Sequence, residues 1–211
     1  MSRPILIVGG APRLRVDAVR FLSVAASGTT AVHLAGGLRA RGLAVELLLG
    51  TLARPEVEAR RYDDRTELEE QLKTWLSTHP EGVVVMSAAI NDYAVTTVER
   101  RVGNDVQRFA PGQKVPSGGD ELLIRLTPAT KVIDQLVAWG HRGPLIGFKY
   151  EDQTTVLVSA ESLRKRTGAA LVVANSLCQT VQALVSEAGV QAFATRDDLM
   201  KTLTEAVAQR T

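Results

Sequence analysis

Cysteine and histidine are scarce in this sequence of 211 residues. The single cysteine, Cys178, excludes an internal disulfide framework and fits a reducing compartment, so we expect a cytoplasmic protein. The histidines, His33, His79 and His141, lie far apart, and none has a second soft ligand near it in the sequence. Because zinc sites need several such ligands at close spacing, we expect no metal site held by side chains.

Long apolar runs and an excess of charge of one sign are also missing. No apolar run reaches the roughly 18 residues that a membrane span requires, and the first residues lack the pattern of a signal peptide. The formal net charge is +2, from 25 basic and 23 acidic residues. This near balance gives no support to a nucleic-acid partner or to a role at a membrane surface.

The alternation of apolar strands and amphipathic helices predicts the fold. Hydrophobic residues make up 45% of the chain, enough for a large core, and the length suits a single α/β domain over residues 1–211. The expected elements of the first half are strands Ile5–Val8, Ala44–Leu49, Val57–Tyr62 and Val83–Met86 and helices Thr30–Arg41 and from Thr66 onward. This order predicts a Rossmann-like, doubly wound, mainly parallel sheet.

A long polar interruption separates the two halves of this pattern. The segment Asn91–Gly119 is rich in glycine and proline, Pro111 included, and such a stretch in a compact domain is usually a lid or disordered. Charges alternate with leucine and isoleucine in Glu121–Leu126, which predicts an exposed antiparallel strand. We therefore expect a small antiparallel excursion, or lid, over about residues 91–126. The other expected elements are helices Thr130–Trp139, Thr155–Thr167 and Arg196–Gln209 and strands Leu145–Lys149, Ala170–Ala174 and Gln191–Thr195.

The segment Asp17–Ala31 joins the first strand to the first helix and is rich in small residues. Ser27 and Gly28 come at the start of the helix, where unpaired backbone N–H groups and the positive end of the helix dipole favour an anion. Small residues let an anion approach the backbone, and Arg20 adds a nearby cation. These residues predict a phosphate site. An ordinary strand-to-helix connection with Ser27 as the N-cap accounts for them equally well.

Small and polar residues follow four of the expected strands. Ligands of open parallel sheets bind beyond the carboxyl ends of the strands, so these residues are expected to converge. They are Gly9 and Gly10 after the first strand, Ser87, Ala88, Ala89 and Asp92 after Val83–Met86, then Phe148 and Lys149, and Asn175. The set suits a nucleotide. Taken singly, each residue has a commoner structural role, such as a turn residue for Asp92 and Asn175 or a core residue for Phe148.

Five stretches together resemble the phosphopantothenoylcysteine synthetases, also called phosphopantothenate–cysteine ligases. They follow the order of that family at about its spacing and span most of the chain. The stretches are GGAPRLRVDAVRFLSVAASGTTA, VVVMSAAINDYAV, QKVPSGGDELLIRLTPATKVI, LIGFKYE and LVVANSL. Lys114 before SGGDELLI and the later GFK run are similar to the stand-alone, eukaryotic-like type, so we expect no flavin decarboxylase portion.

The resemblance implies an activity and a site. The family activates the carboxylate of 4′-phosphopantothenate with CTP or ATP and Mg²⁺, and the amine of cysteine then attacks the acyl-nucleotidylate. The resemblance also implies a homodimer. It places Arg20 and Lys114 in the catalytic machinery, with Lys114 closing over the triphosphate from the mobile loop. The implied nucleotide-binding residues are Ser27, Gly28, Ser87, Ala88, Ala89, Asp92, Phe148, Asn175 and Arg166, although register does not separate Arg166 from Arg164 and Lys165.

One position departs from the family pattern. The family loop carries an asparagine that is linked to handling the acyl-nucleotidylate, and this sequence has Val24 there. Valine cannot donate a hydrogen bond to a developing oxyanion, and losing one such donor typically lowers the rate by about 10²–10³. Either a neighbouring amide such as Asn91 substitutes, or the protein is a diverged relative with altered or lost ligase activity. A Rossmann oxidoreductase is disfavoured, because Gly9 and Gly10 lack the spacing of the glycine fingerprint.

Overall fold

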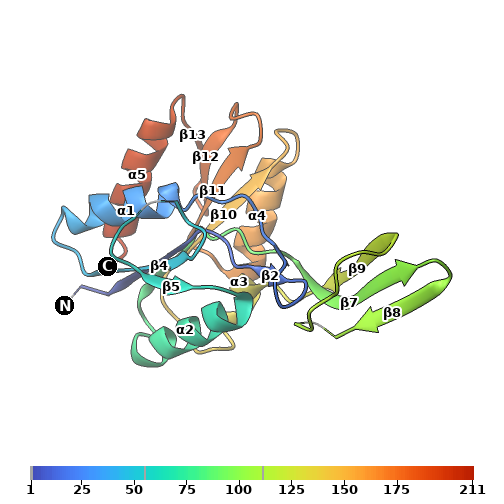
Figure 1. Ribbon diagram of the computed structural model, residues 1–211. Helices are drawn as coiled ribbons and strands as arrows, with labels where there is room; N and C mark the ends of the chain where they lie inside the picture. The colour runs from blue at the N-terminus through green and yellow to red at the C-terminus, as the bar shows by residue number, and fades with distance from the viewer. Residues whose placement is uncertain (1, 55, 111) are drawn as a thin grey trace.

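The computed structural model describes residues 2–54, 56–110 and 112–211, so Pro111 of the excursion lies outside the described residues. Its body is an eight-stranded sheet with the strand order β13-β12-β11-β10-β6-β1-β4-β5 (Figure 1). Neighbours from β5 to β11 pair in parallel, and β12 and β13 pair antiparallel at one edge. The strands are β1 Ile5–Gly9, β4 Val45–Gly50, β5 Arg60–Tyr62, β6 Val83–Met86, β10 Leu145–Glu151, β11 Leu171–Ser176, β12 Gln182–Ser186 and β13 Gly189–Ala192.

Helices cover both faces of this sheet (Figure 1). Helices α1 Thr29–Arg39 and α5 Arg196–Ala208 pack on one face, and α2 Arg65–Thr78, α3 Val132–Gln135 and α4 Val156–Thr167 pack on the other. Successive side chains of a strand point to opposite faces, so Ile7 of β1 joins the core under α1 and α5 while Val8 joins the core under α2 and α4. Burial on both faces explains why the central strands are continuous apolar runs.

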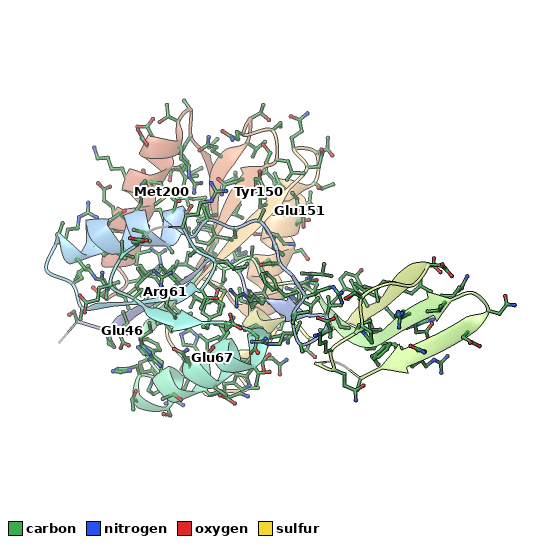
Figure 2. All side chains as sticks on the ribbon, viewed as in Figure 1. Glu46, Arg61, Glu67, Tyr150, Glu151 and Met200 are labelled. Atoms are coloured by element: carbon green, nitrogen blue, oxygen red, sulfur yellow. The ribbon has the colours of Figure 1, made fainter. Side chains whose placement is uncertain are left out.

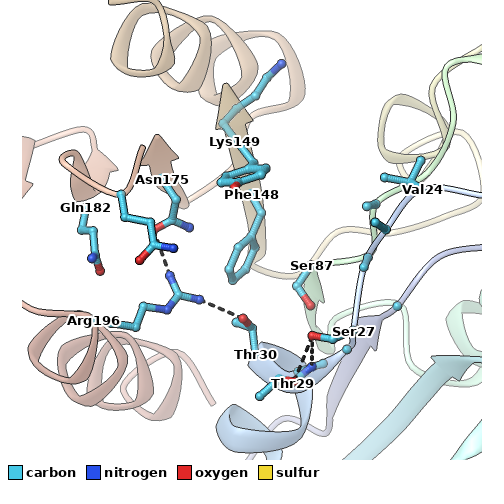
Figure 3. Close-up of a pocket in the computed structure, with 18 of the residues that line it drawn as sticks. Val24, Ser27, Thr29, Thr30, Ser87, Phe148, Lys149, Asn175, Gln182 and Arg196 are labelled. Atoms are coloured by element: carbon cyan, nitrogen blue, oxygen red, sulfur yellow. Dashed lines mark hydrogen bonds between the residues drawn. The ribbon is translucent and has the colours of Figure 1, made fainter. Parts of the chain in front are cut away.

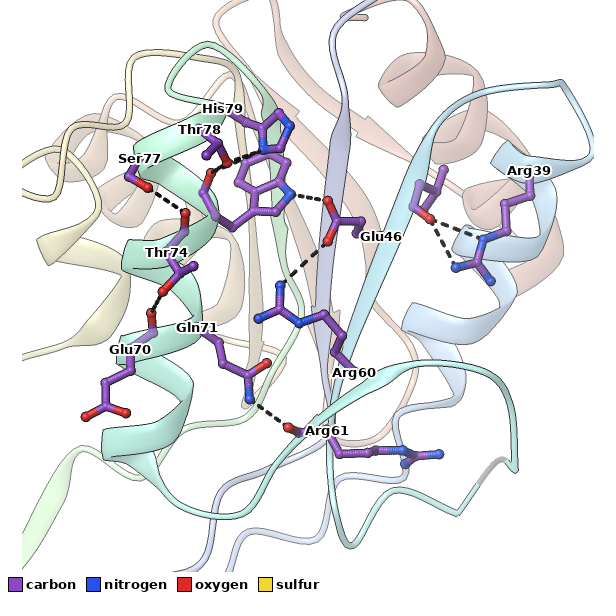
Figure 4. Close-up of polar contacts among 12 residues, drawn as sticks. Arg39, Glu46, Arg60, Arg61, Glu70, Gln71, Thr74, Ser77, Thr78 and His79 are labelled. Atoms are coloured by element: carbon purple, nitrogen blue, oxygen red, sulfur yellow. Dashed lines mark hydrogen bonds and ion pairs between the residues drawn. The ribbon is translucent and has the colours of Figure 1, made fainter.

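Polar contacts fasten the β5 edge of the sheet to α2 (Figure 4). The Glu46 carboxylate on β4 accepts a hydrogen bond from the indole N–H of Trp75 at 2.7 Å, and Arg60 of β5 lies 3.7 Å from its other oxygen. The side-chain amide of Gln71 donates to the backbone oxygen of Arg61 at 2.7 Å. These contacts hold the short strand β5 in place although its own sequence is charged.

A second, smaller sheet projects away from the body (Figure 1). It has three antiparallel strands in the order β8-β7-β9, with β7 Tyr93–Val102, β8 Asp105–Phe109 and β9 Glu121–Pro128. Its core is small, because among the described residues the buried cluster around Val98 adds just Val16 and Val115. Side chains along the sheet extend outward (Figure 2), and Tyr93, Val102, Val106, Leu122, Leu123 and Leu126 are exposed. We call residues 91–126 the excursion.

The fold predicted from the sequence is confirmed, with differences in detail. The parallel sheet and the antiparallel strand at Glu121 are present. Much of Asn91–Gly119, expected as a lid or disordered loop, forms strands β7 and β8 of a hairpin. The helix expected over Thr130–Trp139 is the short α3, and the tail strand lies at Gly189–Ala192, paired with β12, which was not predicted. In the described part of the chain, no helix is long and apolar enough to cross a membrane.

A further pair of very short strands, β2 Leu14–Arg15 and β3 Phe21–Leu22, lies in the segment between β1 and α1. The turn between them is organised by the buried carboxylate of Asp17, which accepts hydrogen bonds from the backbone N–H groups of Val19 and Arg20. The segment is therefore an ordered structure and not a loose connection.

Candidate functional site

A cavity of about 740 Å³ opens at the carboxyl ends of β1, β6, β10 and β11, where α1 begins (Figure 3). This is the edge at which ligands bind in open parallel sheets. Among the described residues, the lining consists mainly of small and amide side chains, with the aromatic rings of Phe148 and Tyr150, two cations and no carboxylate. The lining residues that carry the following argument are Val24, Ser27, Gly28, Thr30, Ser87, Ala89, Phe148, Lys149, Asn175, Gln182 and Arg196.

The amino terminus of α1 forms one wall of this pocket. Gly28 is the N-cap residue, with φ of 77° and no side-chain capping bond, and the first turn of the helix holds no acidic residue. The Ser27 hydroxyl lies 2.9 Å from the Thr29 hydroxyl, beside the helix start. The N-cap residue is thus Gly28 and not Ser27, although the Ser27 hydroxyl oxygen accepts a long hydrogen bond from the Thr29 N–H at 3.4 Å. The backbone N–H groups that the helix itself leaves unpaired, together with its dipole, make this wall attractive to an anion.

Close packing around glycine positions this helix start. A Cβ atom on Gly28 would lie 3.0 Å from the Cβ of Ala53, and a Cβ atom on Gly9 would lie 2.4 Å from the Cβ of Ala31. The distance at Gly9 is too short for two carbon atoms that are not bonded to each other. Helix α1 can therefore approach β1 this closely only because residue 9 is glycine. The sequence places glycine where the backbone itself must form the pocket.

Six of the predicted site residues line the pocket. They are Ser27, Gly28, Ser87, Ala89, Phe148 and Asn175. Ser87 donates its hydroxyl hydrogen to the backbone oxygen of Val8 at 2.7 Å, which ties the end of β6 to β1. The Phe148 ring projects from β10 across the cavity from α1 (Figure 3). The structure thus brings together residues from four strand ends that are far apart in the sequence.

The other predicted residues lie outside the pocket lining. Asp92 pairs with Lys131 on the neighbouring segment, and Arg166 pairs with Asp134 at 3.1 Å on the far side of α4. Ala88 packs against the core under α2 and α4. Arg20 pairs with Asp17 at 2.5 Å, and Lys114 is exposed on the excursion.

Asp17 connects the segment before α1 with the excursion. Its buried carboxylate accepts hydrogen bonds from the backbone N–H groups of Val19 at 2.8 Å, Arg20 at 2.6 Å and Val115 at 3.2 Å. Burial alone would raise the pKa of this carboxyl, but the backbone donors and the Arg20 guanidinium outweigh it and hold the pKa below its usual value. Val115 follows Lys114 directly, so this bond positions the backbone beside that lysine.

Sequence reasoning missed several pocket residues of the carboxyl-terminal region, and Arg196 and Gln182 are the two that carry the argument. Arg196 at the start of α5 donates to the Asn175 side-chain oxygen at 2.9 Å and to the Thr30 hydroxyl at 2.8 Å (Figure 3). Gln182 faces Asn175 in the β11–β12 register, and its buried side-chain oxygen has no hydrogen-bond partner among the described residues. The sequence does mark Arg196 as unusual, because a cation at the start of a helix is unfavourable next to the positive end of the helix dipole. Such a residue suggests a role other than stabilising its own helix.

Val24, the position that departs from the family pattern, also lines the pocket. Its side chain is 41% exposed, and its backbone oxygen accepts from the N–H of Ala26 at 2.9 Å. Asn91, the amide expected as a substitute, is not among the lining residues, and its side-chain oxygen accepts from the N–H of Tyr93 at 3.0 Å. Val24 therefore contributes an apolar surface at the place where the family carries an amide.

The comparisons with known proteins agree on one family. Residues 1–210 match the model of the DNA/pantothenate metabolism flavoprotein C-terminal domain. Among curated relatives, the coenzyme A biosynthesis bifunctional protein CoaBC of Thermococcus kodakarensis is 29% identical over 181 residues, and that of Escherichia coli K12 is 28% identical over 187 residues. These matches cover 83% and 87% of this chain but only 42% and 43% of the relatives. The chain thus spans less than half the length of these curated relatives.

Solved structures share the fold over the whole chain. The DNA/pantothenate metabolism flavoprotein from Streptococcus pneumoniae superposes with a TM-score of 0.84 at 19% identity, covering 100% of both chains. A Cab2 variant in complex with phosphopantothenate-cysteine superposes with a TM-score of 0.78 at 16% identity, covering 99% of this chain and 86% of that one. At these identities the likeness shows the fold alone. With the family match over residues 1–210, the chain belongs to the DNA/pantothenate metabolism flavoprotein C-terminal domain family, which confirms its resemblance to the phosphopantothenoylcysteine synthetases.

Proposed function

We propose that this protein is a nucleotide-dependent ligase that joins 4′-phosphopantothenate to cysteine. CTP or ATP is the second substrate, and Mg²⁺ accompanies its phosphates. The family supports this reaction class, and the pocket supports a nucleotide as the ligand. The observation that carries the proposal is the start of α1 inside a cavity of about 740 Å³, where the N-cap Gly28 at φ 77° makes no side-chain capping bond and the first turn holds no acid.

The groups that remain unpaired in the pocket fit a nucleotide. The buried side-chain oxygen of Gln182 offers an acceptor, which suits the exocyclic amino group of cytosine or adenine. Phe148 offers a ring against which a base or sugar packs. No carboxylate lines the cavity in the described part of the chain, so Mg²⁺ would be held by the phosphates and water and not by a protein cage.

The chemistry needs positioning and charge stabilisation more than a protein nucleophile. A carboxylate oxygen of 4′-phosphopantothenate attacks the α-phosphorus, and pyrophosphate leaves. The cysteine amine then attacks the acyl carbon, and the nucleoside monophosphate leaves with the bonding electron pair. The start of α1 and Ser27 would hold phosphate oxygens, and Lys114 would approach the triphosphate from the excursion.

Val24 supports a second candidate function. Its apolar side chain lines the pocket where the family carries the amide linked to the intermediate. A diverged relative would bind the nucleotide and a phosphopantothenate-like acid but would transfer the acyl group to another acceptor or to none.

The deciding experiment measures pyrophosphate release with 4′-phosphopantothenate, using CTP or ATP, with and without cysteine, and identifies the products by mass spectrometry. Amide product supports the ligase. Pyrophosphate without amide supports the diverged relative, and Val24→Asn then tests whether the amide donor alone restores transfer. Absence of pyrophosphate release with every combination contradicts the ligase.

We also propose that the protein forms a homodimer through the excursion. The exposed apolar side chains of Leu122, Leu123 and Leu126 on β9 support association with a second copy. Sedimentation velocity tests this proposal. A monomer at micromolar concentration contradicts it, and loss of the dimer in Leu123→Glu, but not in a surface variant of α2 such as Glu70→Lys, supports it.

A further inference from the structure

Arg196 occupies a position that its own helix does not explain. It is the first residue of α5, where the helix dipole is positive and where Asp197 and Asp198 follow in the usual way. Thr195 already caps the helix, because its hydroxyl accepts from the N–H of Asp198 at 3.1 Å. The arginine is therefore not needed for capping, and its charge opposes the dipole.

The charge of Arg196 has no carboxylate partner in the described part of the chain. The hydrogen bonds that its side chain makes go to neutral oxygens, on Asn175 and Thr30. Burial is the one cause that acts on the pKa of this guanidinium, and it lowers that pKa. Arginine nevertheless stays protonated in proteins, so a half-buried positive charge remains at the pocket wall.

The other cation of the pocket is already neutralised. Lys149 on β10 pairs with Glu151 at 2.7 Å. Among the residues that the structure describes, no acidic one lines the cavity. Arg196 contacts Thr30 in the first turn of α1, where the helix itself leaves backbone N–H groups unpaired. An anion at this helix start would therefore lie within reach of the guanidinium, which has more N–H donors than its two bonds use.

We propose that Arg196 is the anion-binding side chain of this pocket and that it binds a phosphate group of the ligand. The shared chemistry is a phosphate monoester or polyphosphate, and it is supplied either by the nucleotide or by the phosphorylated acid. A guanidinium presents only donors, so the atom of Asn175 that faces it is the amide oxygen. Arg196 thereby leaves the Asn175 amide hydrogens for another acceptor of the ligand.

The experiment compares Arg196→Gln with the wild-type protein in binding calorimetry. The ligands are CTP, CMP and cytidine, the corresponding adenine series, and 4′-phosphopantothenate against pantothenate. The choice of ligands rests on the proposed function, but binding is measured without turnover, so failure of ligation does not decide this inference. We expect Arg196→Gln to lose about 10–100-fold in affinity for the phosphorylated ligands of one series and little for their unphosphorylated counterparts.

Two further variants separate charge from structure. Arg196→Lys keeps the charge and should recover a large part of the affinity. Arg39→Gln is the matched control, because Arg39 also donates to a neutral oxygen, that of Val45 at 3.0 Å, but lies at the other end of α1. It should leave every affinity unchanged. The salt dependence of nucleotide affinity should also become less steep in Arg196→Gln, which a purely structural role would not cause.

The series that loses affinity identifies the source of the phosphate. A loss confined to CTP and CMP, or to the adenine nucleotides, assigns the nucleotide, and a loss confined to 4′-phosphopantothenate assigns the acid. Equal losses for phosphorylated and unphosphorylated ligands overturn the inference, because they indicate that Arg196 only holds the pocket together. Unchanged affinities, or no binding of any phosphorylated ligand to the wild-type protein, overturn it as well.

Discussion

Helices bury both faces of the eight-stranded sheet. The three-stranded sheet of the excursion has a much smaller core, which in the described part of the chain consists of Val98 with Val16 and Val115 as its fully buried neighbours. The described pocket is lined entirely from the first region. Lys114, which the family resemblance assigns to catalysis, belongs to the second. The ligand-binding wall is therefore supported by a large core on both faces of its sheet, whereas the excursion presents its residues from a sheet with little core of its own.

The largest expected effect comes from the rigid wall. Gly28→Ala and Gly42→Ala place a side chain at nearly the same backbone angle, φ 77° and 76°, so both carry a similar strain of about 1–2 kcal/mol. Only the Cβ at residue 28 meets a close neighbour, Ala53 at 3.0 Å, and only residue 28 borders the pocket. We expect Gly28→Ala to lose about 100-fold in nucleotide affinity by calorimetry. Similar affinities of the two variants would contradict the phosphate site at α1.

A matched pair of valines tests the difference in core size. Val85 in β6 and Val98 in β7 are both fully buried. We expect Val85→Ala to lower the free energy of unfolding by about 2–3 kcal/mol, because close-packed helices on its face cannot collapse into the space. Val98→Ala should lower it by about 1 kcal/mol, because its exposed surroundings can adjust. Urea unfolding measures the free energy of unfolding of both variants. A larger decrease in Val98→Ala than in Val85→Ala would contradict the difference in core size between the two sheets.

Lys114 connects the excursion to function. Lys114→Ala should raise the nucleotide KM about tenfold, because a charged contact to phosphate is lost, while the melting temperature stays unchanged. Arg108→Ala is the control, since Arg108 is also a cation of the excursion and its ion pair with Glu99 is exposed. Unchanged kinetics in Lys114→Ala would remove this lysine from the site.

The smallest expected effect concerns the contact between the two regions. Asp17→Asn should speed hydrogen exchange of the Val115 amide, because the carboxylate that accepts its hydrogen bond loses its charge, and global stability should change little. Lowering the pH should also speed hydrogen exchange of the Val115 amide, because it protonates the Asp17 carboxylate. The pKa of Asp17 is lower in the folded state, so its contribution is complete above the ordinary pKa of 3.8 and is lost as the pH falls through the lower folded value. Exchange that does not depend on pH in this range would contradict the contact.

The sequence predicted the parts of the fold that apolar residues encode. Ile5–Gly9 and Val83–Met86 are fully buried runs, and their burial on both faces produces the pattern that was recognised. Strands β8 and β12 were missed for different reasons. The residues of β8 are exposed apart from the half-buried Phe109, so they lack an apolar face that a pattern could reveal, and β12 is defined by its antiparallel pairing with β11.

The pocket was predicted where it rests on backbone and strand ends, and missed where it rests on distant side chains. Gly28, Ser87 and Asn175 follow from the rule that ligands bind beyond parallel strands. Arg196 reaches the pocket from the last helix, 21 positions after its partner Asn175, and its place at a helix start marks it as unusual without indicating which residue it contacts. The roles of Arg20, Asp92 and Arg166 remain predictions, since each has an ion-pair partner and lies outside the described lining.

The hydrogen bond from the Val115 N–H to Asp17 has a consequence for the entropy of closing the site. A lysine on a loose loop would sample a large volume, and holding it over a ligand would cost the conformational freedom of the whole loop. Here the next residue is already attached to the segment that leads into α1. The backbone beside Lys114 is therefore held in place, so an approach of its side chain to a bound ligand would need side-chain ordering more than a search by the chain.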